Sequence, residues 1–206
     1  MKLWADFHPY VLPDVTGCPI PLLDQTLCET ARDFCTRTKA WIEYGEALEV
    51  DGTQIVFQFD TWTGTEMVSV VSASVDGDDY SVLDRKRLPA SWVTGEQGDI
   101  KDKTIVLVSA QEYVVFPKPN AGQLIRIDLA LRPALGASTV GDVVFDEHLE
   151  AISAGTKAKL MAKPRKEWTD LQFAAFFGAQ FEARIHAAAN TDWRQSAEHR
   201  VSKAGL

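Results

Sequence analysis

The spacing of apolar residues changes twice along the chain, and this change constrains the fold more than any other feature. Apolar residues recur every three to four positions between residues 17 and 41, alternate with polar residues in the middle, and return to the helical spacing after residue 140. A spacing near 3.6 predicts a helix, and strict alternation predicts a strand with one buried face. The sequence therefore predicts one helix, about seven short strands and then two helices.

The first predicted helix lies within GCPIPLLDQTLCETARDFCTRTKAW, which holds all three cysteines. Pro19 and Pro21 suit the first turn of a helix, where an amide hydrogen has no partner. The apolar positions that follow are Leu23, Leu27, Ala31, Phe34, Thr38 and Trp41. Cys28 and Cys35 would lie about 10 Å apart on this helix, beyond the roughly 4.4–6.8 Å between Cα atoms that a disulfide requires. We interpret the cysteines as free, buried residues, not as a metal or redox site.

Asp-Gly pairs and alternating stretches define the β region. Asp51 with Gly52, and Asp76 with Gly77, each separate two apolar runs, which is a strong signal for a β-hairpin. The segments KTIVLVS, EYVVF and QLIRIDLALRP predict further strands, with PKPNAG as a turn and Pro133 as the end of the last strand. Residues 84–103 are polar and irregular, and we expect a long exposed loop there.

Two further helices are expected after Gly141. The first carries an apolar stripe that Pro164 closes, formed by Phe145, Leu149, Ile152, Thr156 and Leu160. Thr169 and Gln172 have the spacing of a capping box at the start of the second helix. We expect its inner face to consist of Phe173, Phe177, Phe181 and Ile185.

These patterns predict an α+β fold in which the N- and C-terminal helices form a bundle and the strands form an inserted antiparallel β-sandwich or barrel-like domain. We expect an N-terminal arm and helix in residues 1–45, a β domain in residues 46–135 and the C-terminal helices in residues 140–190. Residues 191–206 are polar and weakly periodic, so we expect a flexible tail.

Composition narrows the class of function. The net charge of −8, from 29 acidic and 21 basic residues, argues against a broad face that binds nucleic acid. Three cysteines without a framework spacing fit a reducing compartment. The chain shows neither a signal-peptide pattern nor a run of about 20 apolar residues. We expect a soluble protein that is synthesised in the cytoplasm.

No catalytic, cofactor or metal site is predicted. The four acidic residues near the second Asp-Gly pair lack the glycine and glutamate positions of a calcium loop, so we interpret them as part of a turn: Asp76, Asp78, Asp79 and Asp84. The four histidines are scattered, and a solvated helix face accounts for Glu147, His148 and Glu150. The basic triplet in the expected loop is more simply interpreted as hydrated than as a phosphate-binding site: Arg85, Lys86 and Arg87.

Two questions stay open at the level of residues. Gly155, Ala174 and Gly178 each permit close approach of helix backbones, either for packing within the chain or for an interface between subunits. A different class of function, a ligand- or glycan-binding β module on a helical stalk, would use aromatic residues for stacking, and the candidates are Trp62, Tyr80 and Trp92.

Three segments of the chain resemble the tail-adaptor proteins of tailed bacteriophages and prophages. They are DFHPYVLPDVTGCPIPLLDQTLCETARDFCTRTKAW, VFPKPNAGQLIRIDLALRP and FDEHLEAISAGTKAKLMAKPRKEWTDLQFAAFFGAQFEARIHAAAN. The features that carry the likeness are the proline and glycine start with FC and W on the first helix, the PKP turn, and the W before the last helix. The likeness spans residues 6–190 and excludes the loop at residues 84–103.

This resemblance implies a virion structural protein without enzyme activity or cofactor. It would be a head-to-tail adaptor, or connector, subunit that forms a homo-oligomeric ring, often a dodecamer, below the portal and extends the DNA channel. The implied partners are further copies of the chain, the portal protein and the next tail component, such as a nozzle, a tail tube or a second adaptor. DNA would pass through without specific binding. A tail-completion or terminator ring protein is the alternative within this class.

The polar tail carries a bulky side chain followed by bases, which would suit an acidic groove. The resemblance points the same way, because related adaptors seat on the portal through a terminal arm. We therefore expect residues 191–206 to dock on the portal through Trp193, Arg194, His199, Arg200 and Lys203.

Overall fold

The computed structural model describes the backbone of residues 1–59, 61–84 and 102–203, and the side chains of these residues apart from those at 84 and 190–203. The chain divides into two compact units. The helical unit contains Met1–Trp41, Thr63–Glu66 and Leu131–Leu206, and the β unit contains Ile42–Trp62 and Met67–Ala130. The predicted α+β class is confirmed, since helices and mainly antiparallel sheets both occur.

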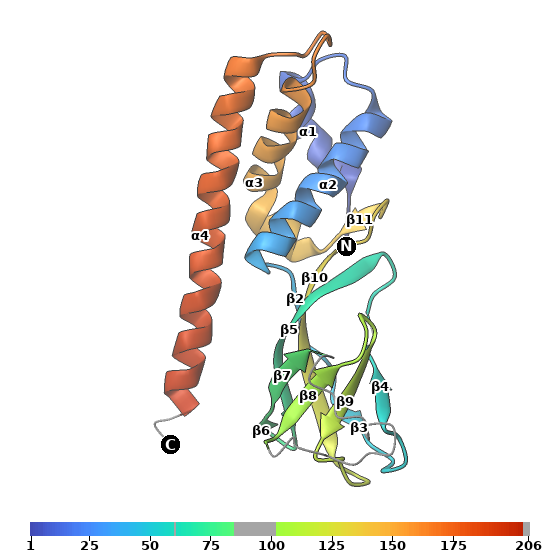
Figure 1. The fold of residues 1–206 in the computed structure, drawn as a ribbon. Coiled ribbons are helices and arrows are strands. Elements are labelled where there is room, and N and C mark those ends of the chain that lie inside the picture. Colours follow the sequence, from blue (N-terminus) through green and yellow to red (C-terminus); the bar gives the residue numbers. More distant parts are fainter. Residues whose placement is uncertain (60, 85–101, 204–206) are drawn as a thin grey trace. The chain divides into compact units, whose positions relative to one another are not determined.

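Three long helices form the helical unit (Figure 1): α2 (Ile20–Thr38), α3 (Asp142–Met161) and α4 (Leu171–Lys203). The predicted stripe of α2 is buried, and Leu23, Leu27 and Phe34 have no exposed surface. Helices from the two ends of the chain contact each other, as predicted, because the rings of Phe34 and Phe181 lie 6.3 Å apart. Among the described helices, none has the length and apolarity that crossing a membrane requires.

The N-terminal residues pack on the helices as a series of short elements, which we call the N-terminal arm. Strand β1 (Lys2–Leu3) pairs antiparallel with β11 (Thr139–Val140). Two 3-10 turns at Trp4–Phe7 and Leu12–Asp14 flank α1 (His8–Val11). These short elements were not predicted from the sequence, although the buried residues recur every three to four positions: Trp4, Phe7, Val11 and Val15.

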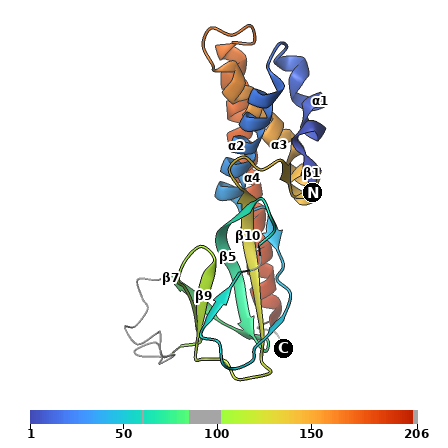
Figure 2. The same ribbon diagram turned by 90° about the vertical axis from the view of Figure 1, so that its right-hand side faces the viewer.

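The strands of the β unit form two separate sheets, so the described residues do not close a barrel (Figure 2). One sheet has the order β2 (Ile42–Glu43), β10 (Leu124–Pro133), β5 (Thr65–Val75), β6 (Asp78–Asp79), with β3 (Leu48–Glu49) also on β10. The other has the order β4 (Val56–Gln58), β9 (Glu112–Phe116), β8 (Thr104–Leu107), β7 (Ser81–Asp84). The alternation in β10 is confirmed, because Ile125, Ile127, Leu129 and Leu131 are all buried.

Only one of the two predicted Asp-Gly hairpins is confirmed. Asp76 (φ 51°) and Gly77 (φ 84°) turn the chain between β5 and β6, which pair antiparallel. The turn at Asp51 and Gly52 also exists, but β3 pairs with β10 and β4 pairs with β9, so the flanking strands join different sheets. Turn chemistry fixes the reversal of the chain, whereas the partner of each strand depends on contacts distant in sequence.

The expected loop at residues 84–103 lies mainly outside the described residues, together with Arg85, Lys86, Arg87 and Trp92. The strands on either side of it, β7 and β8, pair in parallel. Parallel neighbours require a crossover of a dozen or more residues, which accounts for the length of this connection.

Helix α4 differs from its prediction at both ends. Its cap is Asp170, whose Oδ1 accepts hydrogen bonds from the backbone N–H groups of Gln172 and Phe173, each at 3.0 Å. Thr169 instead donates to the carbonyl of Lys163. The backbone of the tail, for which no helix was predicted, is helical as far as Lys203. Residues 191–203 contain several good helix formers and neither proline nor glycine, so nothing in the sequence stops a helix that has already been nucleated.

Candidate functional site

The three cysteines are buried and unpaired. Burial raises the pKa of the Cys35 thiol to about 12, and it also raises the pKa of Cys28. A thiol with a raised pKa stays protonated at neutral pH and is a poor nucleophile and metal ligand. Within the described ranges, no group of three or more His, Cys, Asp or Glu residues is placed to hold a metal ion. Cys28 and Cys35 are buried on α2, as their helical spacing predicts.

The acidic residues near Gly77 serve the turn. The carboxylate of Asp76 accepts hydrogen bonds from the backbone N–H of Leu124 and from the side chain of Gln123, each at 2.8 Å. These bonds hold the pKa of Asp76 below its usual value. Asp78 forms an ion pair with Lys103 at 2.6 Å. Both acids are therefore engaged within the β unit.

The position of His148 corrects the prediction of a solvated helix face. Glu147 and Glu150 are exposed, as expected, and Glu150 pairs with Arg184. His148 is partly buried, and its ring lies 4.8 Å from that of Phe34. The solvated face is therefore wrong for this residue, because the α3 stripe is wide enough to draw the imidazole inward. Desolvation lowers the pKa of His148.

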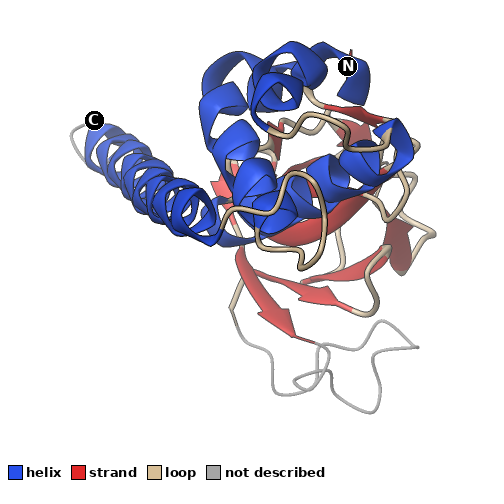
Figure 3. Ribbon diagram, turned by 90° about the horizontal axis from the view of Figure 1, so that it is seen from above, coloured by secondary structure: helices blue, strands red, loops and turns tan. Residues whose placement is uncertain are grey.

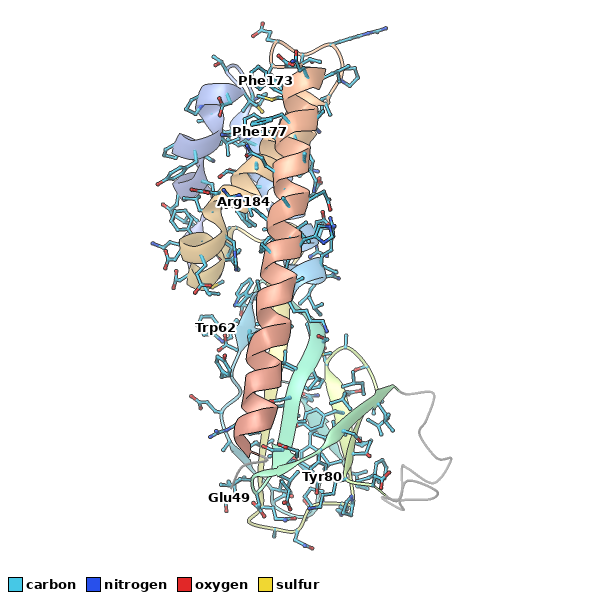
Figure 4. All side chains as sticks on the ribbon, turned by 90° about the vertical axis from the view of Figure 1, so that its left-hand side faces the viewer. Glu49, Trp62, Tyr80, Phe173, Phe177 and Arg184 are labelled. Atoms are coloured by element: carbon cyan, nitrogen blue, oxygen red, sulfur yellow. The ribbon has the colours of Figure 1, made fainter. Side chains whose placement is uncertain are left out.

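The proposed stacking residues of the β unit are not brought together. Trp62 is 53% exposed, whereas Tyr80 is partly buried and its pKa is raised by that burial. Figure 4 shows the two side chains at opposite ends of the β unit. Trp62 and Tyr80 thus do not form a common platform for a ligand.

The small residues of α3 and α4 have different environments. Gly155 is buried, and a Cβ atom there would lie 2.7 Å from Thr30 Cγ2 and 2.8 Å from the Phe181 ring. A Cβ atom at Gly178 would meet only the Ala158 side chain, at 3.9 Å. Ala174 is partly buried. Gly155 therefore allows α2, α3 and α4 to approach one another within the chain.

The first two turns of α4 expose large apolar side chains. Leu171 is 69% exposed, Phe173 is 53% exposed and Phe176 is 54% exposed. We call these three residues the aromatic edge. The expected inner face of α4 is thus confirmed at Phe181 and Ile185 but wrong at Phe173. The helical period identified an apolar stripe, but it does not reveal whether a stripe is covered by the same chain.

Contacts with Phe177 hold the aromatic edge in place. The ring of Phe177 lies 6.3 Å from the ring of Phe173 and 5.4 Å from the ring of Phe176. Lys157 of α3 places its ammonium 4.9 Å from the centre of the Phe177 ring and also pairs with Asp14 at 2.5 Å. Phe177 therefore anchors the two exposed rings to the helical unit (Figure 4).

Basic residues flank the aromatic edge. The segment that joins α3 to α4 contains Lys163, Arg165 and Lys166. Arg165 and Lys166 are exposed, and Lys163 is partly buried. No ion pair is described for any of the three among the described residues. Glu167 and Asp170 are exposed in the same segment. This part of the helical unit is therefore apolar with charges of both signs at its border.

A pocket of about 460 Å³ lies elsewhere on the helical unit, between the N-terminal arm, α2 and the turn before β11. We call it the arm pocket. Its lining comes from residues 3–5, from residues 24, 25, 28 and 29, and from residues 135–138. Trp4 Nε1 donates to the Ala137 carbonyl at 2.5 Å, which joins two of its walls. Leu3 and Leu135 are 54% and 77% exposed, so its lining includes apolar residues open to solvent.

The tail residues expected to dock on the portal, Trp193, Arg194, His199, Arg200 and Lys203, have side chains outside the described residues. Only their helical backbone is described.

Comparison of the chain with protein-family models and with curated proteins found no match.

Proposed function

We propose that this chain is a structural subunit of a ring at the head-to-tail junction of a tailed bacteriophage or prophage. The ring joins the portal to the next tail component and surrounds a channel through which DNA passes without specific binding. In this proposal the helices form the bundle of the subunit and the two sheets form an inserted β-sandwich. The resemblance of three segments to tail adaptors indicates the class of assembly.

The observation that carries this proposal is the apolar outer surface of a helix that already has a buried side. Phe181 and Ile185 bury one side of α4, whereas Phe173 and Phe176 are more than half exposed. Exposed alanines continue the outer side at positions 175, 179 and 183. Large exposed apolar patches mark interaction sites. Contact with a neighbouring subunit accounts for this surface.

Residues 191–206 are the proposed contact with the portal. Because α4 continues to Lys203, this C-terminal segment would reach the portal as a helix. The basic residues Arg194, Arg200 and Lys203 would then face an acidic groove, with Trp193 as the apolar anchor.

Tail-less capsids that carry the portal test the proposal. We expect the purified chain to bind capsids of the phage or prophage that encodes it, and to form a ring at the portal vertex in electron micrographs. Deletion of residues 191–206 should abolish binding while circular dichroism shows that the fold is retained. A full-length chain that neither binds nor forms a ring would contradict the function. A truncated chain that still binds would contradict only the role of residues 191–206.

The same experiment separates the alternative within this class. A tail-completion or terminator ring would bind the end of an isolated tail tube and not the portal vertex. Tail tubes included as a second binding target therefore distinguish the two positions in the virion.

A further inference from the structure

We infer that the aromatic edge of one copy of this chain docks in the arm pocket of a second copy. The inference rests on the proposed function, because it names the interface through which the ring subunits meet. A surface that binds a different surface on an identical chain makes a heterologous contact, and repeated heterologous contacts form a closed ring when the rotation allows closure.

The two surfaces match in size and apolar character. The aromatic edge offers Phe173 and Phe176, each more than half exposed and each supported by Phe177. The arm pocket has a volume of about 460 Å³, within the roughly 300–1,000 Å³ of pockets that take small organic molecules. It can therefore admit an aromatic ring. Aromatic side chains that enter a pocket are the usual anchors of protein interfaces.

Each of the two surfaces offers exposed charges that could pair with the other. The exposed bases Arg165 and Lys166 precede the aromatic edge, in a segment that also carries Glu167 and Asp170. The arm pocket is lined by Glu29 and by Asp24, and Asp24 contacts His8 at 2.6 Å. The described partner of Glu29 is the neutral side chain of Gln25, so its carboxylate is available to a cation from a second copy. Complementary charges at the border of an interface orient the partners and speed their association. This match favours a second copy over a basic or neutral partner at the aromatic edge.

The two surfaces lie on different sides of the helical unit. Figure 1 shows α4 on one side, and the N-terminus and β11 on the other, and Figure 3 shows the N-terminus away from the long C-terminal helix. A chain cannot fill its own pocket with its own aromatic edge in this arrangement. Each copy therefore keeps one free edge and one free pocket for two different neighbours.

Two variants with opposite defects test the contact. The first, F173S with F176S, removes the aromatic edge and keeps the pocket. The second, S138W, fills the pocket from an exposed position in its lining and keeps the edge. We expect each variant alone to associate with itself at least about tenfold more weakly than the natural chain, a change that corresponds to about 1.4 kcal/mol. Analytical ultracentrifugation of each variant at increasing concentration measures this effect.

Mixing the two variants gives the decisive result. The intact edge of S138W can enter the intact pocket of the double variant, but no third chain can add. We therefore expect the mixture to form a complex of two chains, twice the mass of the 22.8 kDa chain, while each variant alone stays monomeric. Y44S serves as a control, because Tyr44 is 75% exposed and belongs to the β unit. Circular dichroism confirms that every variant is folded.

Reversal of charge provides an independent test. We expect R165E with K166E, and E29K, to weaken self-association, and we expect one chain that carries all three substitutions to recover it. The recovery should diminish at high salt, because screening shortens the reach of surface charges.

Three outcomes would overturn the inference. In the first, the mixed variants remain monomers at the highest concentration. In the second, the aromatic edge variant associates with itself as strongly as the natural chain. In the third, the aromatic edge variant loses self-association but S138W does not. The last result would indicate either a symmetric contact between two edges or a different partner. If the edge variant still forms rings on capsids, only this interface is wrong. If the two-chain complex forms but the natural chain does not bind capsids, only the proposed function is wrong.

Discussion

At the scale of single residues, Gly155 determines how closely three helices approach. A Cβ atom at this position would be too close to Thr30 of α2 and to the ring of Phe181 of α4. Both neighbours are buried, and Phe34 lies behind the Phe181 ring. In a closely packed interior neither neighbour can move without disturbing others. The absence of a side chain at Gly155 is therefore a condition of the helical packing.

We expect Gly155→Ala to lower the free energy of unfolding and Gly178→Ala to raise it. Both changes gain up to about 1 kcal/mol in helix propensity, but the methyl group at residue 155 overfills the core, which typically costs about 1–3 kcal/mol. At residue 178 the new methyl group would meet Ala158 at an ordinary 3.9 Å. Urea unfolding of both variants measures the difference, and equal stabilisation by the two changes would show that the space around Gly155 is not restrictive.

His148 gives the stability of the helical unit a pH dependence. Desolvation lowers its pKa in the folded chain, and Glu147 only partly opposes the shift. The unfolded chain, with a pKa near 6.5, therefore binds more protons than the folded chain below that pH. Stability should fall as the pH is lowered through about 6.5 and should level off below the folded pKa.

His148→Gln should remove this component. We expect the free energy of unfolding of the variant, relative to that of the natural chain, to rise between pH 8 and pH 5. Urea unfolding at several pH values measures it. A difference that is constant with pH would contradict the lowered pKa. His186→Gln is a matched control, because His186 is exposed on α4.

At the scale of elements, the start of α4 depends on Asp170 and not on Thr169. Asp170 accepts hydrogen bonds from two backbone N–H groups of the first turn. We expect Asp170→Ala to lower the free energy of unfolding by about 1 kcal/mol, within the usual range for the loss of a cap. Asp170→Asn should keep most of the stability. An alanine variant as stable as the natural chain in thermal unfolding would contradict this assignment of the cap.

Elements with their own buried stripe could be predicted from the sequence, and elements defined by distant partners could not. The period of α2 placed Leu27 and Phe34 correctly in the core, and the alternation of β10 placed Ile125 correctly. The two strands beside Gly52 were given the wrong partner, because a turn does not select between sheets. The aromatic edge was missed for a related reason: Phe173 continues the stripe of Phe181 in sequence, but the described residues leave it more than half exposed.

At the scale of the whole molecule, the charge is strongly negative but unevenly distributed. The net charge is −8, whereas three bases lie within four residues in the segment between α3 and α4. A channel wall that held phosphate groups would slow the passage of DNA. A chain with an overall negative charge repels the duplex, and three bases can neutralise only a few phosphates.

We therefore expect no measurable affinity for duplex DNA at about 0.1 M salt, where charges still act over roughly 10 Å. Fluorescence anisotropy of a labelled duplex, titrated with the natural chain, measures the affinity. A variant with K163E, R165E and K166E shows whether any residual binding comes from the segment before α4. Binding in the micromolar range that weakens with salt and is lost in this variant would mean that the segment contacts phosphate. The bases beside the aromatic edge would then serve nucleic acid as well as a neighbouring subunit, and the idea of a channel that repels DNA would be wrong. Absence of binding in both proteins would leave the three bases available for the carboxylates of the arm pocket.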